Sequence, residues 1–311
     1  MIENEKEMDP KDPEKRNKNQ IDKLKTITKI KGQFKRKSKF IKHKIILIFV
    51  LHFLFTIEMQ NLLNIYIIAH RDFPLKINNK AYKILCDEKS QLKRKYNLTI
   101  IETNKENPLT LKRRGYSECS KMYYIWRFYK KGYLSSKYVG FAHYRRLFRF
   151  KDNIPNLDLI FSKYDAILKS LTKTYASMRA NFNYAHLGRF MDEVVAIIKE
   201  KFPEYYPSAL YFLSHNVVSY CNIFIMKKKD FIKWGEFVFG VLLEFDRRHK
   251  LKTDRDIEQL VRCELIRIHR RTDGYFGVKY QSRLQGFIIE RVTNMFYVKH
   301  FKKNYYIGTA A

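Results

Sequence analysis

The chain has 311 residues and a formal charge of +31, and 45% of its residues are hydrophobic. This composition excludes a largely disordered protein and supplies core material for one large domain or two small ones. The charge favours an anionic partner (nucleic acid, a membrane surface or a phosphorylated small molecule), although a lysine-rich background explains it equally well.

The N-terminal part of the chain differs from the rest in composition and in the pattern of its apolar residues. Residues 1–44 are basic and lack periodic apolar positions, which predicts a disordered segment. The apolar run at 45–57 is short for a membrane-spanning helix but fits a signal sequence or short signal anchor over 45–61. We therefore expect membrane attachment through 45–57 or a location in the secretory pathway. The alternative is a buried core helix, with the protein in the cytoplasm.

Strand and helix patterns then alternate along residues 62–303. Strands are expected in β-rich apolar runs, and helices where apolar residues recur every three or four positions. The expected elements are a strand at 64–70, a helix at 79–96, a strand at 98–103, a helix from Ser117, strands at 138–142 and 164–170, a helix at 184–202, a strand at 217–226, and helices around 231–245, 257–265 and 284–295. This order predicts one α/β domain with a mostly parallel sheet, flanking helices and a helical C-terminal part.

Two of the expected strands end in a histidine followed by cationic residues. The first runs into His70 and Arg71, and "YVGFAHYRR" runs into His143, Arg145 and Arg146. Ligands of open α/β sheets bind beyond the carboxyl ends of the strands. Paired guanidinium groups at that position can hold a phosphate or diphosphate through bidentate hydrogen bonds. The pattern thus indicates an anionic ligand at this edge of the sheet.

In its strand context, "HYRR" resembles the domain-of-unknown-function 4422 family. The family also has a strand ending in a His-Lys pair, a "Y-S-E…Y-x-I-W" helix and an "R-x-x-G-F/Y-x-x-E-R" helix. The counterparts here are His70-Arg71 and the segments 116–126 and 282–292. "FPEYYPSA" (202–209) and "CNIFIMKKKDF" (221–231) also resemble family segments. The resemblance covers residues 64–299 in order.

This resemblance implies a glycosyltransferase with a GT-A-like, Rossmann-like fold. Family members are glycosyltransferase-like proteins, mostly of bacterial capsule and lipopolysaccharide loci, and some act on galactofuranose. The implied enzyme is of the hexosyltransferase type. Its partners are a nucleotide-sugar donor, namely a UDP-sugar such as UDP-galactofuranose, and a glycan or glycolipid acceptor. No nucleic-acid partner is expected from it.

The resemblance also indicates the site residues. In many GT-A proteins the strand corresponding to "HYRR" carries an Asp-x-Asp that binds a metal on the donor diphosphate. Here His143, Arg145 and Arg146 are expected to stabilise that charge instead. Glu290 is a candidate acceptor-side base, and the alternative is an internal ion pair with Arg291. The residues expected to bind the donor are His70, Arg71, Tyr116, Glu118, Tyr144, Arg283 and Arg291.

No metal site is evident in the sequence. Asp254 and Asp256 form a literal D-x-D, but a capping aspartate at a helix start explains the pattern better. The metal ligands therefore stay unknown, and a requirement for Mn²⁺ or Mg²⁺ stays open. The cysteines are widely spaced without a C-x-x-C pair, which excludes a zinc finger and predicts small core residues at Cys86, Cys119, Cys221 and Cys263.

Two other functions remain open at this point. Basic residues alternate with aromatic ones in "RRLFRF" and "WRFYKKGY", as in proteins that bind single-stranded nucleic acid. No recognised nucleic-acid motif accompanies these segments. The other alternative is a carbohydrate-binding relative without catalytic activity.

Overall fold

The computed structural model describes residues 62–74, 77–274 and 276–310. The predictions of a disordered segment at 1–44 and of a signal or anchor at 45–61 concern residues before this part of the chain. Among the helices that are described, none combines the length and the hydrophobicity needed to cross a membrane.

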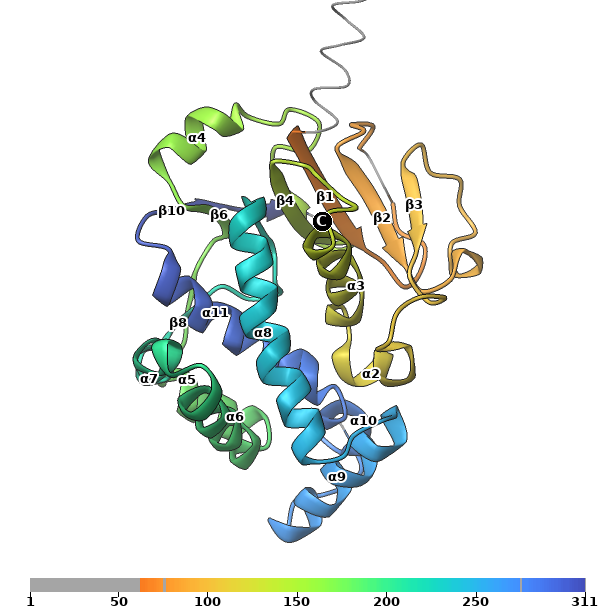
Figure 1. The fold of residues 1–311 in the computed structure, drawn as a ribbon. Helices are drawn as coiled ribbons and strands as arrows, with labels where there is room; N and C mark the ends of the chain where they lie inside the picture. The colour runs from red at the N-terminus through yellow and green to blue at the C-terminus, as the bar shows by residue number, and fades with distance from the viewer. Residues whose placement is uncertain (1–61, 75–76, 275, 311) are drawn as a thin grey trace, which may run out of the picture. The chain divides into compact units, whose positions relative to one another are not determined.

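The centre of the fold is a seven-stranded sheet with the order β10-β6-β9-β4-β1-β2-β3 (Figure 1). β9 is antiparallel to both of its neighbours, and the other pairs are parallel. The strands are β1 (Leu63–Ile68), β2 (Tyr82–Cys86), β3 (Thr99–Glu102), β4 (Tyr138–His143), β6 (Ala166–Lys169), β9 (Phe224–Lys227) and β10 (Asn304–Ile307). Because β10 belongs to the sheet, the folded unit extends past residue 303.

Two short ladders lie outside the main sheet. β5 (Leu147–Phe148) pairs with β11 (Thr309–Ala310), and β7 (Thr172–Lys173) pairs with β8 (Val217–Val218). Both pairs are antiparallel. The pair of β5 and β11 joins the segment after "HYRR" to the last strand of the described chain.

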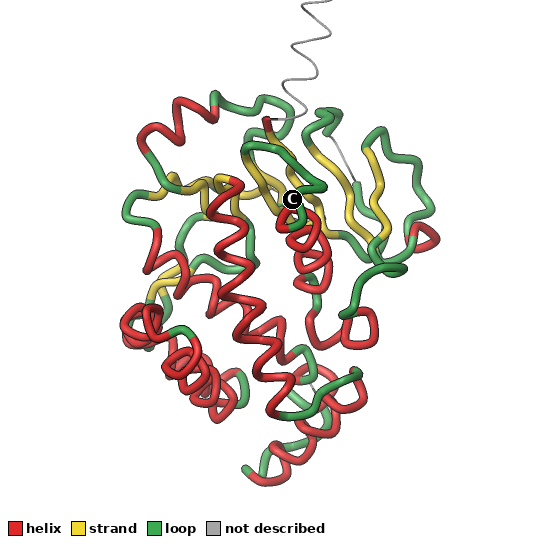
Figure 2. Tube along the Cα trace, in the orientation of Figure 1, coloured by secondary structure: helices red, strands yellow, loops and turns green. Residues whose placement is uncertain are grey.

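Helices cover both faces of the sheet, with most of them on one side (Figure 2). Val139 and Phe141 of β4 point into the larger core with α3 and α8, whereas Tyr138 and Ala142 point into the smaller core with α4. The helices are α2 (Arg113–Tyr116), α3 (Cys119–Lys130), α4 (Leu157–Lys163), α5 (Met178–Ala185), α6 (Gly188–Lys201), α7 (Tyr206–Ser214), α8 (Lys228–Arg248), α9 (Asp254–Arg267), α10 (Val278–Gln281) and α11 (Leu284–His300). The alternation of side chains along each strand thus places the sheet between two apolar layers.

Most of the predicted elements are confirmed, but two are wrong. The expected helix at 79–96 contains strand β2 and a short 3₁₀ helix, Lys89–Gln91. Tyr82, Leu85 and Cys86 have helical spacing, yet all three are buried because β2 lies between β1 and β3. A strand that is buried on both faces shows no alternation, so its apolar residues can imitate a helix.

The expected long strand at 217–226 is interrupted. Cys221 and Asn222 adopt left-handed backbone angles, with φ of 77° and 49°. The chain therefore turns between β8, which pairs outside the main sheet, and β9, which lies within it. This turn brings the Cys221 N–H to the carboxylate of Glu290, at 2.6 Å.

The cysteine prediction is confirmed only in part. All four thiols are free, but Cys86 and Cys119 are buried whereas Cys263 is exposed and Cys221 is intermediate. Cys263 lies on α9, on the side of that helix that faces away from the core.

Candidate active site

A cavity of about 660 Å³ opens beyond the carboxyl ends of β1, β2 and β4. It receives residues from the ends of these strands and the loops after them, from α2 and the start of α3, from the first residue of α9 and from the residue before α11. Its lining consists of Ile68, His70, Arg71, Asp87, Arg113, Arg114, Ser117, Glu118, Lys121, His143, Tyr144, Arg145, Asp254 and Arg283. The cavity lies at the edge of the sheet where ligands of open α/β folds bind.

A tight turn after β4 separates the two arginines of "HYRR". The His143 N–H donates to the Arg146 carbonyl and the Arg146 N–H donates back to the His143 carbonyl, at 3.3 and 2.7 Å. Tyr144 and Arg145 form the tip of this turn, and both line the cavity. Arg146 does not line it, and its guanidinium lies 2.8 Å from the sulfur of Cys221. The turn therefore directs only Arg145 to the cavity.

Tyr144 organises the cationic side chains around it. Its hydroxyl accepts a hydrogen bond from Arg71 Nε at 3.1 Å and lies 3.3 Å from His70 Nε2. The guanidinium of Arg145 lies 5.3 Å from the centre of the Tyr144 ring, and that of Arg71 lies 5.6 Å from it. The tyrosine itself is buried. One aromatic ring thus positions cations from β1 and β4 on the same side of the cavity.

The cations of the cavity are only partly neutralised. Lys121 pairs with Asp87 at 2.8 Å, Arg113 lies 3.8 Å from Glu88, and Arg114 pairs with Glu258. In the part of the chain that the structure describes, no ion pair includes Arg71, Arg145 or Arg283. A cavity with uncompensated guanidinium groups attracts an anion that can accept several hydrogen bonds.

The two histidines of the cavity are held neutral near pH 7. Burial and the neighbouring Arg145 lower the pKa of His143 to about 4. Burial, Lys121 and Arg71 lower the pKa of His70 as well. Each neutral imidazole keeps one N–H that it can donate to a ligand.

The free energy of unfolding should fall on mild acidification because two histidines with lowered pKa values, His143 of the cavity and His186 of the core, must take up protons. The pKa is about 4 for His143 and about 3 for the buried His186, whose pKa is lowered by burial and Arg291. An unfolded histidine binds its proton near pH 6.5, so these groups favour unfolding as the pH falls below that value. We expect the free energy of unfolding to drop by about 2 kcal/mol per histidine between pH 7 and pH 5.

Urea denaturation at the two pH values measures this loss. His143→Gln and His186→Gln should each reduce the difference, because glutamine does not titrate. Equal stability of the native protein at pH 7 and pH 5 would contradict the assignment.

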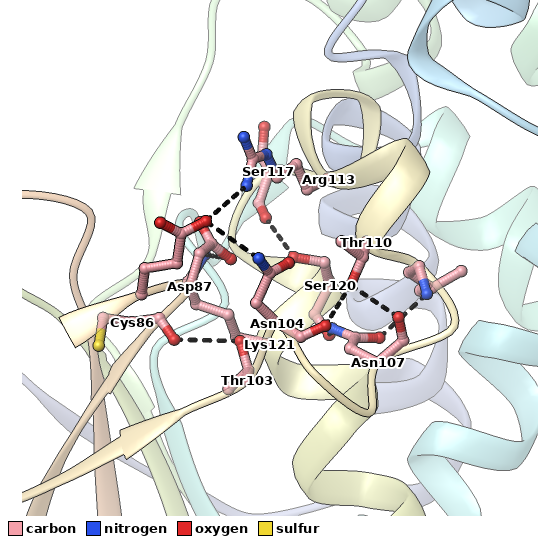
Figure 3. Close-up of polar contacts among 12 residues, drawn as sticks. Cys86, Asp87, Thr103, Asn104, Asn107, Thr110, Arg113, Ser117, Ser120 and Lys121 are labelled. Atoms are coloured by element: carbon pink, nitrogen blue, oxygen red, sulfur yellow. Dashed lines mark hydrogen bonds and ion pairs between the residues drawn. The ribbon is translucent and has the colours of Figure 1, made fainter. Parts of the chain in front are cut away.

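A polar network fixes the end of β2 against α3. Asp87 directly follows β2, and its ion pair with Lys121 is almost buried, with the Lys121 side chain 5% exposed. Close by, Asn104 donates to Glu88 at 3.0 Å and Ser120 donates to the Ser117 carbonyl at 3.1 Å (Figure 3). The network holds one wall of the cavity in place.

Sequence reasoning missed Asp87 and Lys121. Asp87 directly follows β2, whose apolar residues have helical spacing, so the sequence around it does not reveal the end of a strand. Lys121 lies one helical turn after Glu118, and that spacing places both on one face of α3.

Seven of the predicted site residues line the cavity: His70, Arg71, Glu118, His143, Tyr144, Arg145 and Arg283. Their roles stay predictions. Arg146, Glu290, Arg291 and Tyr116 are not part of the lining.

Glu290 and Arg291 form an ion pair with each other. Glu290 accepts from Arg291 at 2.8 Å and from the Cys221 N–H at 2.6 Å. The Arg291 side chain is 4% exposed and lies over the rings of Phe182 and Tyr220. This buried pair joins α11 to the turn before β9.

Tyr116 belongs to a buried polar cluster beneath the cavity. Its hydroxyl donates to Asp246 of α8 at 2.7 Å. The same carboxylate accepts from Gln285 at 2.9 Å and pairs with Lys112. The side chains of Lys112 and Asp246 are only 10% and 4% exposed. The cluster ties α2, which lines the cavity, to α8 and α11.

The D-x-D sequence supports helix structure, as the capping interpretation predicts. Asp256 completes a capping box with Thr253 at the start of α9. Asp254 accepts from the backbone N–H groups of Gly115 and Arg114, at 2.9 and 3.2 Å. Within residues 62–310, as far as they are described, no three His, Cys, Asp or Glu side chains group closely enough to hold a metal ion. The carboxylates of this D-x-D are thus engaged by backbone N–H groups at the start of α9 and in α2.

Together, the mostly parallel sheet, its helical layers and the cavity at the strand ends define a Rossmann-like protein of the GT-A-like class. The chain belongs to the DUF4422 family, described as a domain of unknown function, whose model matches residues 64–263. The predicted family is thereby confirmed. The segment 282–292, which also resembles the family, lies outside the matched range.

The fold is similar to that of a solved glycosyltransferase structure. The apo structure of WbbM, described as a bifunctional glycosyltransferase, matches with a TM-score of 0.58 and 18% sequence identity. The match covers 80% of this chain but only 45% of the WbbM chain. It confirms the predicted GT-A-like fold. No curated protein matches the sequence.

Proposed function

We propose that this protein is a glycosyltransferase that moves a sugar from a nucleotide-diphosphate sugar to a glycan or glycolipid acceptor. The observation that carries the proposal is a set of three guanidinium groups in one cavity at the strand ends, Arg71, Arg145 and Arg283, none of which forms an ion pair with a described residue. The family and the GT-A-like fold support it, because proteins of this class bind nucleotide sugars there. The donor is a UDP-sugar, with UDP-galactofuranose as the first candidate, and the enzyme is of the hexosyltransferase type.

The proposed chemistry follows from the charge that develops on the leaving group. Breaking the bond between the sugar and the diphosphate leaves a nucleoside diphosphate with increased negative charge. Arg145 and Arg71 would stabilise that charge, and neutral His143 would donate a hydrogen bond to it. Tyr144 would act as a positioning residue, since it contacts both arginines without being exposed.

Ligand binding tests this proposal. Isothermal titration calorimetry would use UDP, UDP-galactose, UDP-galactofuranose, a GDP-sugar, a CMP-sugar, free galactose and a single-stranded oligonucleotide, each with EDTA and with Mn²⁺. We expect UDP and a UDP-sugar to bind, and free galactose to bind at least tenfold more weakly. Binding of free sugar alone would favour the non-catalytic alternative, and binding of the oligonucleotide alone would favour the nucleic-acid alternative.

A further inference from the structure

Three carboxylates line the cavity, and two of them have structural partners. Asp87 forms the ion pair with Lys121 at 2.8 Å. Asp254 accepts from the backbone N–H of Gly115 at 2.9 Å. Glu118 is the third, and no ion pair of the described residues includes it. Its carboxylate contacts the Asn222 amide and its own backbone N–H, and it is the one of the three that neither an ion pair nor the backbone of another element holds.

The backbone before α3 directs Glu118 toward the cavity. Ser117 adopts φ of 51° and ψ of −130°, so the chain turns sharply between α2 and α3. Glu118 follows directly and makes no side-chain capping bond to the helix. A capping role, which is the usual function of an acid at a helix start, therefore does not occupy it.

The groups that face Glu118 come from three other parts of the fold. Glu290 of α11 interacts with it as a like charge, and Arg283, just before α11, as an opposite charge. The Asn222 amide contacts it from the turn before β9, and Cys119 is its neighbour on α3. Burial, followed by Glu290, raises the pKa of Glu118, while Arg283 and Asn222 oppose the rise. A raised pKa makes a carboxylate a stronger base, which accepts a proton more readily.

We propose that Glu118 is the general base of the transfer reaction. The inference rests on the proposed function and replaces the sequence-based roles of Glu118 as a donor contact and of Glu290 as the base. As the acceptor oxygen bonds to the anomeric carbon, its proton passes to the Glu118 carboxylate. The bond from that carbon to the diphosphate oxygen breaks, and the nucleoside diphosphate leaves with the bonding electron pair.

Glu290 does not suit that task. Its two oxygens are engaged by Arg291 and by the Cys221 N–H. Losing the bond to Arg291 would leave a buried guanidinium without its counter-charge. Losing the bond to the Cys221 N–H would leave the turn before β9 without its anchor. Glu290 acts on the reaction through its charge, by keeping the pKa of Glu118 raised.

Hydrolysis of the donor tests the proposal without knowledge of the acceptor, because water can serve as the acceptor. Release of UDP from UDP-galactofuranose and UDP-galactose would be followed from pH 5 to pH 9 in the full-length protein. Glu118→Gln keeps the shape of the side chain but cannot accept the proton. Glu236→Gln is the matched control, since Glu236 is a half-exposed glutamate on α8 that pairs with Lys130 outside the cavity.

We expect Glu118→Gln to lower kcat by about 10²- to 10⁴-fold while the Kd for UDP stays within about twofold. The acid limb of the pH profile should disappear in this variant. Formate should restore part of the activity of Glu118→Ala, because a small carboxylate can enter the vacated space. Glu236→Gln should behave like the native protein.

The outcomes separate this inference from the proposed function. If the native protein binds UDP and releases it from a UDP-sugar, but Glu118→Gln does so at the native rate, only the base assignment is wrong. If Glu118→Gln loses UDP binding and keeps kcat, the residue is a donor contact instead. If the native protein binds none of the nucleotides, or binds them without any turnover, the proposed function fails as well.

Discussion

Arg145→Ala is expected to lower the turnover of a UDP-sugar by about 10²- to 10³-fold, the usual effect of losing one preorganised charge-stabilising group. Arg145 lies at the tip of the turn after β4, lines the cavity and has no carboxylate partner among the residues that the structure describes. Its guanidinium lies over the Tyr144 ring, and no described carboxylate holds its N–H groups before an anion binds. The measurement is kcat/KM for release of UDP, together with the Kd for UDP.

Lysine at position 145 should restore only part of the lost turnover, because it keeps the charge but not the planar, bidentate geometry. The fold should be unaffected, with the free energy of unfolding changed by less than about 0.5 kcal/mol, since the side chain is exposed. Arg149→Ala, in the same segment but outside the cavity lining, is the control. Native turnover in both Arg145→Ala and Arg71→Ala would refute the proposal that these arginines stabilise the charge on the leaving diphosphate.

Asp246→Ala is expected to destabilise the protein by about 3–5 kcal/mol, because it leaves the buried Lys112 ammonium without its counter-charge. The substitution also removes the acceptor of the Tyr116 hydroxyl and of Gln285. An unpaired charge in a low-dielectric interior is costly, and no other acidic partner of Lys112 occurs among the described ion pairs. Urea denaturation measures the effect directly.

A surface ion pair of the same helix provides the comparison for Asp246. Glu236→Ala breaks the pair with Lys130, whose partners are about half exposed, and should cost less than about 1 kcal/mol. The double variant Lys112→Met/Asp246→Leu should recover only part of the stability: it removes the unpaired charge, but the Tyr116 hydroxyl and Gln285 still lack their acceptor. Equal stability of Asp246→Ala and Glu236→Ala would show that the cluster does not hold α2 to α8.

The sequence by itself determined the elements whose signal is local. The uniformly apolar runs that form β1 and β4 are recognisable without their neighbours, and so are the helical periodicities of α8, α9 and α11. The basic residues after β1 and β4 could be located from sequence because strand ends follow directly from strand positions. The family motif around "HYRR" also indicated that the residues after β4 belong to the site.

Only the tertiary structure decided which side chains of those motifs meet in the cavity. Arg145 and Arg146 are neighbours in sequence, and a two-residue turn sends them to different surroundings. Asp87 lines the cavity because β2 pairs in parallel with β1 and β3, which places the residue after β2 at the same edge of the sheet. The local spacing of residues along the sequence does not encode this pairing with distant segments. Tyr116 and Glu290 are structural because the Asp246 carboxylate and the Cys221 N–H, which lie far from them along the chain, form hydrogen bonds with them once the helices pack.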